Sequence, residues 1–226
     1  MIPITYNFAR CESFNEDYIV AHMNEVALAP KNIPLEQAAR IPMVSLTAWS
    51  ALFDCAHLRK GQSILIQGAS GGVGHMAVQL AKNAGAYVIG VTSQPNLNLV
   101  KSLGADQVID YRSEDFSQKV KNMDVVFDAV GSETHTKSFA VIKKRGILVS
   151  IVDPPDELIA KQFGVSGKFA FVSTNGKRLE EISKLIDAGK LRVVIDKTFP
   201  LSEAKAAQEY SQAGHVRGKI ILNVSN

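Results

Sequence analysis

A glycine-rich segment is the part of this sequence with the clearest chemical use. Residues 68–74 read Gly-Ala-Ser-Gly-Gly-Val-Gly and follow the apolar run Ser63–Gln67. Glycines let the chain turn sharply out of a strand, let the backbone approach a pyrophosphate without a Cβ in the way, and let the next helix pack closely. The free N–H groups at the start of that helix then attract the phosphates. The segment therefore predicts a dinucleotide-binding loop.

Walker A loops and methyltransferase loops fit this segment less well. A Walker A loop is excluded because no Gly-Lys-Ser/Thr follows the glycines. A methyltransferase is the more serious alternative, but its loop adjoins acidic residues that hold a ribose, and the sequence has no Asp or Glu between Asp54 and Asp106. A glycine-rich turn that only packs is the remaining alternative.

The same acid-free stretch bears on the choice of cofactor. An NAD site usually carries an acidic residue about 20 positions after the loop, bonded to the ribose 2′-hydroxyl. Residues 92–96 read Thr-Ser-Gln-Pro-Asn there. A carboxylate would repel a 2′-phosphate, whereas hydroxyl and amide groups can bind one. Thr92 and Ser93 therefore favour NADPH over NADH, with Lys101 and Arg112 as candidate cationic donors nearby.

The elements that must position this loop follow from the hydrophobic pattern. Short apolar runs alternate with segments in which apolar residues recur every three or four positions. The predicted strands cover 63–67, 87–92, 107–111, 125–130, 147–152 and 168–173, and the predicted helices cover 73–84, 96–103, 114–121, 133–142 and 179–188. This alternation predicts an α/β fold with a doubly wound parallel sheet.

The two ends of the chain do not follow that alternation. Residues 1–32 look irregular except for a predicted strand over 17–21, and Pro30 and Pro34 precede the next helix. At the other end we expect a strand over 191–199, a helix over 202–212 and a strand over 219–224. These ends are candidates for a partial second lobe.

Composition excludes several classes of protein. The chain has 226 residues, of which 46% are hydrophobic and 21% charged, and a net charge of +3 without a dense Lys/Arg run. These values argue against a disordered tail, a disulfide scaffold and a nucleic-acid partner. Cys11 and Cys55 form no ligand-spaced group with the five histidines, so no metal site is expected. Without a signal peptide or an apolar run long enough for a membrane span, we expect a soluble cytoplasmic protein with no membrane partner.

Several motifs in order along the chain resemble the zinc-free quinone oxidoreductases, the zeta-crystallin-like branch of the medium-chain dehydrogenase/reductase superfamily. The segments that carry the resemblance are 46–49, 61–66, 68–74, 78–81, 103–106, 109–111, 128–131 and 215–219. The resemblance implies an NADPH-binding Rossmann domain over 35–191, a remnant of a GroES-like catalytic domain over 1–34, and a return to that domain over 192–226.

The resemblance also implies a set of cofactor-binding positions. Ser70, Gly71, Gly72 and Val73 match the pyrophosphate loop, and Ser93 and Tyr111 match the surroundings of the adenosine ribose phosphate. Gly74 of the glycine motif and Thr92 of the acid-free stretch are candidates from the residues themselves. Thr47 and Ser132 match the middle of the cofactor, Ile151, Val152 and Asp153 match the nicotinamide end, and Phe171, Val172 and Ser173 match a strand that reaches cofactor or a partner subunit. Asp153-Pro154-Pro155 departs from the family, which has a more neutral turn with glycine there.

The activity implied by the resemblance is hydride transfer from NADPH to a quinone or an activated alkene (an enone or enal), and the assembly implied is a homodimer. In relatives about 100 residues of the catalytic domain, including the active-site tyrosine, precede the stretch that matches Tyr18. No residue here is therefore assigned a catalytic role. A non-catalytic NADPH-binding module is the alternative function.

Overall fold

The computed structural model describes residues 3–5, 21–214 and 216–223. Their contacts divide the chain into two compact units. One unit comprises Thr47–Phe171, and the other comprises the described residues up to Leu46 together with those from Val172 onward. Each unit is described by itself.

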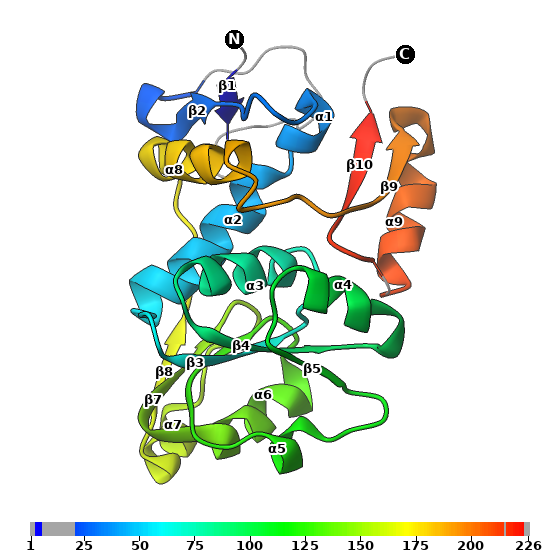
Figure 1. Cartoon of the computed structure of the whole chain (residues 1–226). Coiled ribbons are helices and arrows are strands. Elements are labelled where there is room, and N and C mark those ends of the chain that lie inside the picture. The colour runs from blue at the N-terminus through cyan, green and yellow to red at the C-terminus, as the bar shows by residue number, and fades with distance from the viewer. Residues whose placement is uncertain (1–2, 6–20, 215, 224–226) are drawn as a thin grey trace. The chain divides into compact units, whose positions relative to one another are not determined.

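The unit Thr47–Phe171 is built on a six-stranded sheet in which every neighbouring pair is parallel (Figure 1). The strand order is β5-β4-β3-β6-β7-β8, so the chain order reverses between β3 and β6. The strands are β3 (Ser63–Gln67), β4 (Tyr87–Thr92), β5 (Gln107–Asp110), β6 (Met123–Asp128), β7 (Ile142–Ser150) and β8 (Ser166–Phe169). The predicted parallel α/β sheet is confirmed.

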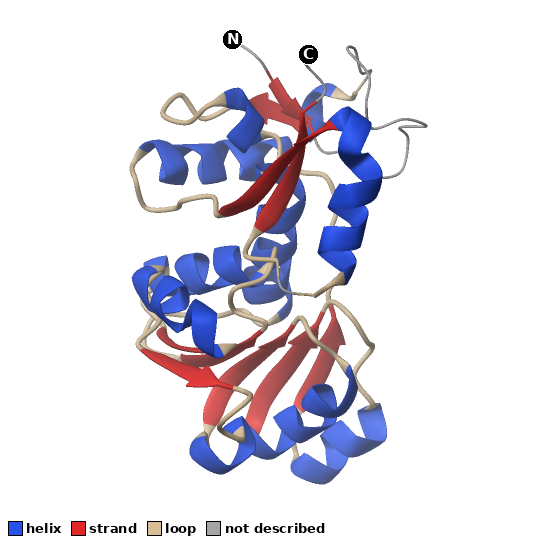
Figure 2. Cartoon of the chain, turned by 90° about the vertical axis from the view of Figure 1, so that its right-hand side faces the viewer, coloured by secondary structure: helices blue, strands red, loops and turns tan. Residues whose placement is uncertain are grey.

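Helices cover both faces of this sheet (Figures 1 and 2). Helices α3 and α4 lie on one face, and α5, α6 and α7 lie on the other. Their bounds are α3 (Gly74–Asn83), α4 (Leu97–Ser102), α5 (Phe116–Lys119), α6 (Ser132–Ser138) and α7 (Glu157–Phe163), with 3-10 turns at Gln94–Asn96 and Phe139–Val141. Ahead of β3, α2 (Ile41–Trp49) continues into a π-helix at Ser50–Cys55. The sheet is therefore doubly wound.

The core of this unit explains why its strands read as apolar runs. Leu65 of β3 pairs with Val126 of β6, which pairs with Leu148 of β7, and all three side chains are fully buried. On the α5, α6 and α7 side, Phe116 and Phe139 join the same cluster. Burial of one such side chain contributes about 1.5–3 kcal/mol, so these central strands are the part of the sheet most strongly specified by sequence.

Strands β5 and β6 differ from their predicted bounds by one or two residues, and β7 and β8 differ more. Strand β7 begins at Ile142, five residues before the predicted start, because Lys143, Lys144 and Arg145 are exposed and interrupt the apolar pattern. Strand β8 comprises Ser166–Phe169 rather than 168–173, since this edge strand consists mainly of exposed residues while the apolar run lies just beyond it. The pattern of apolar residues in the sequence thus predicts buried strand segments better than exposed ones.

The other unit contains two small sheets. Strands β1 (Pro3–Thr5) and β2 (Val26–Leu28) pair antiparallel, and β9 (Ile195–Pro200) and β10 (Lys219–Asn223) pair parallel. Its helices are α1 (Leu35–Ala38), α8 (Gly176–Asp187) and α9 (Ala204–Gln212), with 3-10 turns at Met23–Glu25 and Leu201–Glu203. Positions 17–20 of the strand predicted over 17–21 lie outside the described residues.

Helix α8 accounts for the difference between these units and the predicted 35–191 domain. Its Ser183 hydroxyl donates to the Leu28 carbonyl at 3.0 Å, and its Asp187 carboxylate accepts hydrogen bonds from Lys31 N and Asn32 N at 2.7 and 3.1 Å. Helix α8 also packs against β2. The sequence alternation continues through α8, but this helix packs against β2 and the 3-10 turn Met23–Glu25.

Arg40 is an unusual residue of this unit. Only 8% of it is exposed, and its Nη1 donates to the Lys219 carbonyl at 3.0 Å. Its Nε and Nη2 atoms have no hydrogen-bond partner in the structure. Burial lowers the pKa of Arg40 to about 10, and burial followed by the nearby Arg40 charge lowers the pKa of Lys219.

Candidate functional site

The glycine loop lies between the end of β3 and the start of α3, where a dinucleotide-binding loop belongs. Gly71 N donates to the Gly68 carbonyl at 2.9 Å and closes the turn, and Gly68 has a φ of +66°. A Cβ on Gly74 would lie 2.1 Å from the Gly68 oxygen. The close approach of the helix to the loop therefore requires glycine at position 74, as the predicted motif demands.

Polar side chains collect beside this loop at the carboxyl end of β4. The Thr92 hydroxyl donates to Ser70 Oγ at 2.7 Å, and Asn96 Nδ2 donates to Ser70 Oγ and Ser93 Oγ at 3.3 and 3.2 Å. Ser70, Thr92 and Asn96 are buried, and Asn96 Oδ1 has no partner in the structure. We call Ser70, Thr92, Ser93 and Asn96 the hydroxyl–amide cluster. It carries no charge and keeps one buried acceptor atom available.

The neighbouring strand places two more groups at the same edge. Tyr111 N donates to the Thr92 carbonyl at 3.1 Å, and the Arg112 guanidinium lies 5.9 Å from the centre of the Tyr111 ring. Asp110 pairs in register with Thr92 and is buried, but it accepts hydrogen bonds from Arg112 N and the Ser113 hydroxyl of its own turn. Asp110, the acidic residue in register with Thr92 of the cluster, thus stabilises its own turn.

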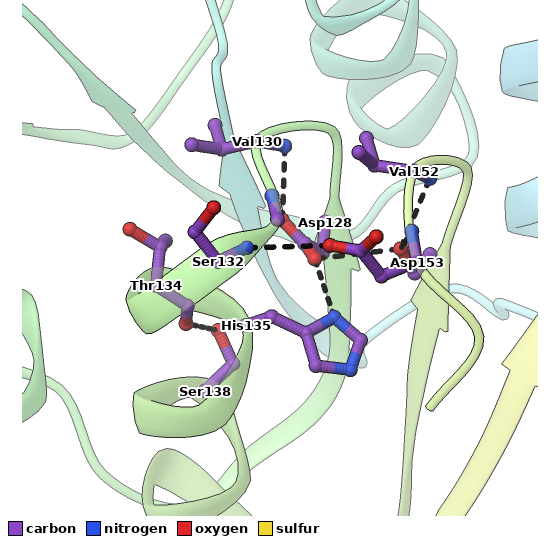
Figure 3. A network of polar contacts seen from close by, with 10 residues as sticks. Asp128, Val130, Ser132, Thr134, His135, Ser138, Val152 and Asp153 are labelled. Carbon is purple, nitrogen blue, oxygen red and sulfur yellow. Dashed lines mark hydrogen bonds and ion pairs between the residues drawn. The ribbon is translucent and has the colours of Figure 1, made fainter. Parts of the chain in front are cut away.

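A second polar network joins the loops that follow β6 and β7 (Figure 3). Asp128, at the end of β6, is fully buried, and one of its oxygens accepts hydrogen bonds from Val130 N and Gly131 N at 3.0 Å each. His135 Nδ1 lies 2.7 Å from the other oxygen. Asp128 therefore fixes the start of the β6–α6 loop.

Ser150 links this network to the β7–α7 loop. Its hydroxyl lies 3.4 Å from Asp128 Oδ2, and its oxygen accepts from Val152 N and Asp153 N at 3.2 Å each. The Asp153 carboxylate in turn accepts a hydrogen bond from Ser132 N at 3.3 Å (Figure 3). The two loops are thus held together by side chains at the carboxyl ends of adjacent strands.

The structure brings the predicted cofactor residues together in two groups. One group, at the ends of β3, β4 and β5, consists of Ser70, Thr92, Ser93 and Tyr111. The other consists of Ser132, the first residue of α6, and of Ile151, Val152 and Asp153 on the loop after β7. Thr47 lies in α2 and is buried. Phe171 is 80% exposed, and its ring contacts Phe169 with centroids 4.7 Å apart. Val172 and Ser173 belong to the other compact unit.

Three polar residues of this edge were not predicted from the sequence. They are Gln67, Asp110 and Asp128, each buried and the last residue of its strand, whereas Asn96 belongs to the stretch 92–96 already expected to bind the 2′-phosphate. Gln67 Nε2 has no partner in the structure. Their shared signal is a polar residue at or just after an apolar strand. These unpartnered buried atoms and the glycine loop fit a polar nucleotide across the carboxyl edge of the sheet.

The described residues hold neither a metal-ligand cluster nor a membrane-spanning helix. Among residues 3–5, 21–214 and 216–223, no three His, Cys, Asp or Glu side chains are grouped as metal ligands would be. No helix in this part of the chain combines the length and the apolar character that crossing a membrane requires.

The known proteins that this chain resembles are dehydrogenases and NAD(P)H-dependent oxidoreductases. A family model described as zinc-binding dehydrogenase matches residues 103–222. The human mitochondrial NAD(P)H oxidoreductase RTN4IP1 is 37% identical, over 92% of this chain and 60% of its own length. The chloroplastic NADPH-dependent alkenal/one oxidoreductase of Arabidopsis thaliana is 36% identical, over 91% of this chain and 52% of its own length.

A solved structure shows the same fold. The quinone oxidoreductase from Coxiella burnetii matches with a TM-score of 0.83 and 35% identity, over 88% of this chain and 64% of that one. The chain therefore spans about 60% of the length of the human relative and somewhat more of the bacterial one.

Proposed function

The chain belongs to the zinc-binding dehydrogenase family, within the medium-chain dehydrogenase/reductase superfamily, and on that premise we propose that it is an NADPH-dependent oxidoreductase of the quinone oxidoreductase type. The observation that carries this proposal is the glycine loop beside the uncharged hydroxyl–amide cluster. The substrate is a quinone or an activated alkene, the two classes that appear in the names of its relatives.

The hydroxyl–amide cluster supports NADPH over NADH. Ser70, Thr92 and Ser93 offer hydroxyl groups and Asn96 an amide, so the cluster itself presents no carboxylate to a 2′-phosphate. The Arg112 guanidinium next to Tyr111 supplies a cation on the neighbouring turn. A phosphate binds well to such groups because guanidinium and hydroxyl donors satisfy its oxygens.

The remaining residues of the edge orient and shield the cofactor. When bound, NADPH supplies the hydride, and the protein contributes binding and orientation. Gly68 and Gly74 bring the loop backbone close to the pyrophosphate. Asp128 and Ser150 hold the β6–α6 and β7–α7 loops in place for the nicotinamide half.

Cofactor preference is tested by fluorescence titration of the purified chain with NADPH and with NADH. We expect tighter binding of NADPH, and Ser93→Asp should weaken NADPH binding about tenfold or more by charge repulsion while leaving NADH binding within about twofold. Ser102→Asp on α4 is a matched control, because Ser102 is exposed and donates to the Leu99 carbonyl of its own helix. Equal affinity for the two cofactors would contradict the preference.

Turnover is measured separately, because the chain spans about 60% of its human relative. NADPH oxidation is followed at 340 nm with a quinone or with an enone as acceptor. Oxidation that depends on acceptor supports the enzyme. Binding of NADPH without oxidation supports the second candidate, a non-catalytic NADPH-binding module, and failure to bind NADPH refutes both.

Three further properties belong to the proposal. The reaction needs no zinc, so activity should survive a metal chelator. The chain forms a homodimer through the open edge of β8, with the exposed hydrophobic side chain of Phe171 just beyond that strand. A monomer by light scattering at micromolar concentration would argue against it. The protein works in the cytoplasm, which cell fractionation tests.

A further inference from the structure

The Asp153 carboxylate occupies a defined place on the sheet edge. In a doubly wound sheet a dinucleotide lies across the point where strand order reverses, with one nucleotide over each half. That point lies between β3 and β6. The hydroxyl–amide cluster is on the β4 side, so the adenosine half belongs there and the nicotinamide half belongs over β6 and β7, where Asp153 follows β7.

The two halves of the edge are in direct contact. A Cβ on Gly68 of the glycine loop would lie 3.2 Å from Cγ2 of Val130 in the β6–α6 loop. A nucleotide whose pyrophosphate lies on the glycine loop therefore continues directly onto the β6–α6 and β7–α7 loops. Ser132, the first residue of α6, donates its N–H to Asp153 of the β7–α7 loop.

The position of the carboxylate is fixed by the backbone around it. Asp153 Oδ2 accepts from Ser132 N, and Asp153 N donates to the Ser150 hydroxyl. Gly131 has a φ of +80°, and a Cβ there would lie 2.5 Å from Asp153 Oδ2. Glycine at 131 thus leaves the space in which the carboxylate lies, so its charge has a defined location although the side chain is exposed.

This charge is also less compensated than the others on the same loops. Asp128 is buried and bonded to His135 and two backbone N–H groups. The Glu133 carboxylate pairs with Lys137. No described lysine, arginine or histidine forms an ion pair with Asp153.

We propose that Asp153 makes the site discriminate between the two redox states of the cofactor and favour NADP⁺. The inference rests on the proposed function. The nicotinamide ring is positively charged when oxidised and neutral when reduced, so a fixed carboxylate lowers the free energy of the oxidised complex and leaves the reduced complex unchanged. Asp153 is thus a specificity-determining residue that slows release of the oxidised product.

The test is the ratio of dissociation constants for NADP⁺ and NADPH, measured by titration at low ionic strength. Asp153→Asn removes the charge but keeps the shape, and we expect it to raise that ratio about fivefold, as a unit charge about 4 Å away in a water-like medium implies. The change should shrink at about 1 M salt, where the screening length falls to about 3 Å. Asp153→Glu should restore a ratio close to that of the wild type.

Asp156→Asn is the matched control. Asp156 lies three residues further along and caps α7 by accepting from Leu158 N and Ile159 N, and asparagine caps a helix equally well. This variant loses the same charge but should leave the ratio unchanged. An equal effect of the two variants, or no effect of Asp153→Asn, would overturn the inference. Failure of the wild type to bind either cofactor would instead refute the proposed function, and the inference with it.

Discussion

Replacement of Gly74 by alanine is a direct test of the glycine loop. The Cβ of alanine would lie 2.1 Å from the carbonyl oxygen of Gly68, 2.8 Å from its carbonyl carbon and 2.9 Å from Ala69 Cα. All three are backbone atoms, so no side chain can rotate away to make room. Carbon contacts are optimal at about 3.5 Å, and the loop and the helix must therefore separate by about 1 Å.

The expected magnitude follows from that displacement. Overpacking a closely packed site costs about 1–3 kcal/mol of unfolding free energy, and the better helix propensity of alanine recovers at most about 1 kcal/mol. A displacement of about 1 Å in a group that positions a ligand can cost about 100-fold in activity. We therefore expect Gly74→Ala to weaken NADPH binding about 10- to 100-fold in a protein that still folds.

The assay combines NADPH titration with urea denaturation of the same samples. Gly71→Ala is the control for the steric effect on the fold, because its Cβ would meet only the Gly68 oxygen, at 3.2 Å, and we expect its unfolding free energy to fall by at most about 1 kcal/mol. The reasoning would be refuted if Gly74→Ala bound NADPH as tightly as the wild type at unchanged stability. It would also be refuted if Gly71→Ala destabilised the fold more than Gly74→Ala.

Two further predictions concern stability. Burial alone would raise the pKa of Asp124, but hydrogen bonds from Lys143 and from Ser63 N and Oγ outweigh it and lower that pKa. A carboxyl with a lowered folded pKa stabilises the fold above its unfolded pKa, about 3.9, and loses this contribution as pH falls through the folded pKa. Asp124→Asn should therefore lower the free energy of unfolding by about 1 kcal/mol at pH 7. Urea denaturation should show that the difference between wild type and variant shrinks below about pH 4, and a difference that does not change with pH would contradict a lowered pKa of Asp124. Phe139→Ala removes a fully buried ring that stacks on Phe163. It should lower the unfolding free energy by about 3–5 kcal/mol. A loss below about 1 kcal/mol in the same assay would show that the hydrophobic cluster around Phe139 rearranges to fill the space.

Much of the central sheet could be predicted from the sequence. Strands β3 and β4 have the predicted bounds, Ser63–Gln67 and Tyr87–Thr92, because buried strands of a parallel sheet are nearly continuous apolar runs. The exposed stretch Lys143–Arg145 of β7 was not predictable in this way, since it forms an irregularity between the pairs that Ile142 and Ile147 make with β6.

Some features of the candidate site could also be predicted from the sequence, and others could not. The glycine loop was predictable because its function requires a residue type at fixed spacing along the chain. The contact between Asp128 and His135 was not, because it joins a strand end to the next helix in three dimensions. The sequence shows Asn96 only as part of an uncharged stretch, and its burial against Ser70 depends on how β4 lies beside β3.

Arg40 has a consequence for engineering this protein. Arg40 is 8% exposed, and its guanidinium makes one hydrogen bond, to the Lys219 carbonyl. This single hydrogen bond offsets little of the hydration free energy that the guanidinium loses on burial. Natural proteins keep such residues because selection maintains stability only above a threshold. A buried ion can be exchanged for an apolar side chain of similar volume without loss, and often with a gain. Replacing Arg40 by leucine or methionine should therefore raise the free energy of unfolding, which would help crystallisation.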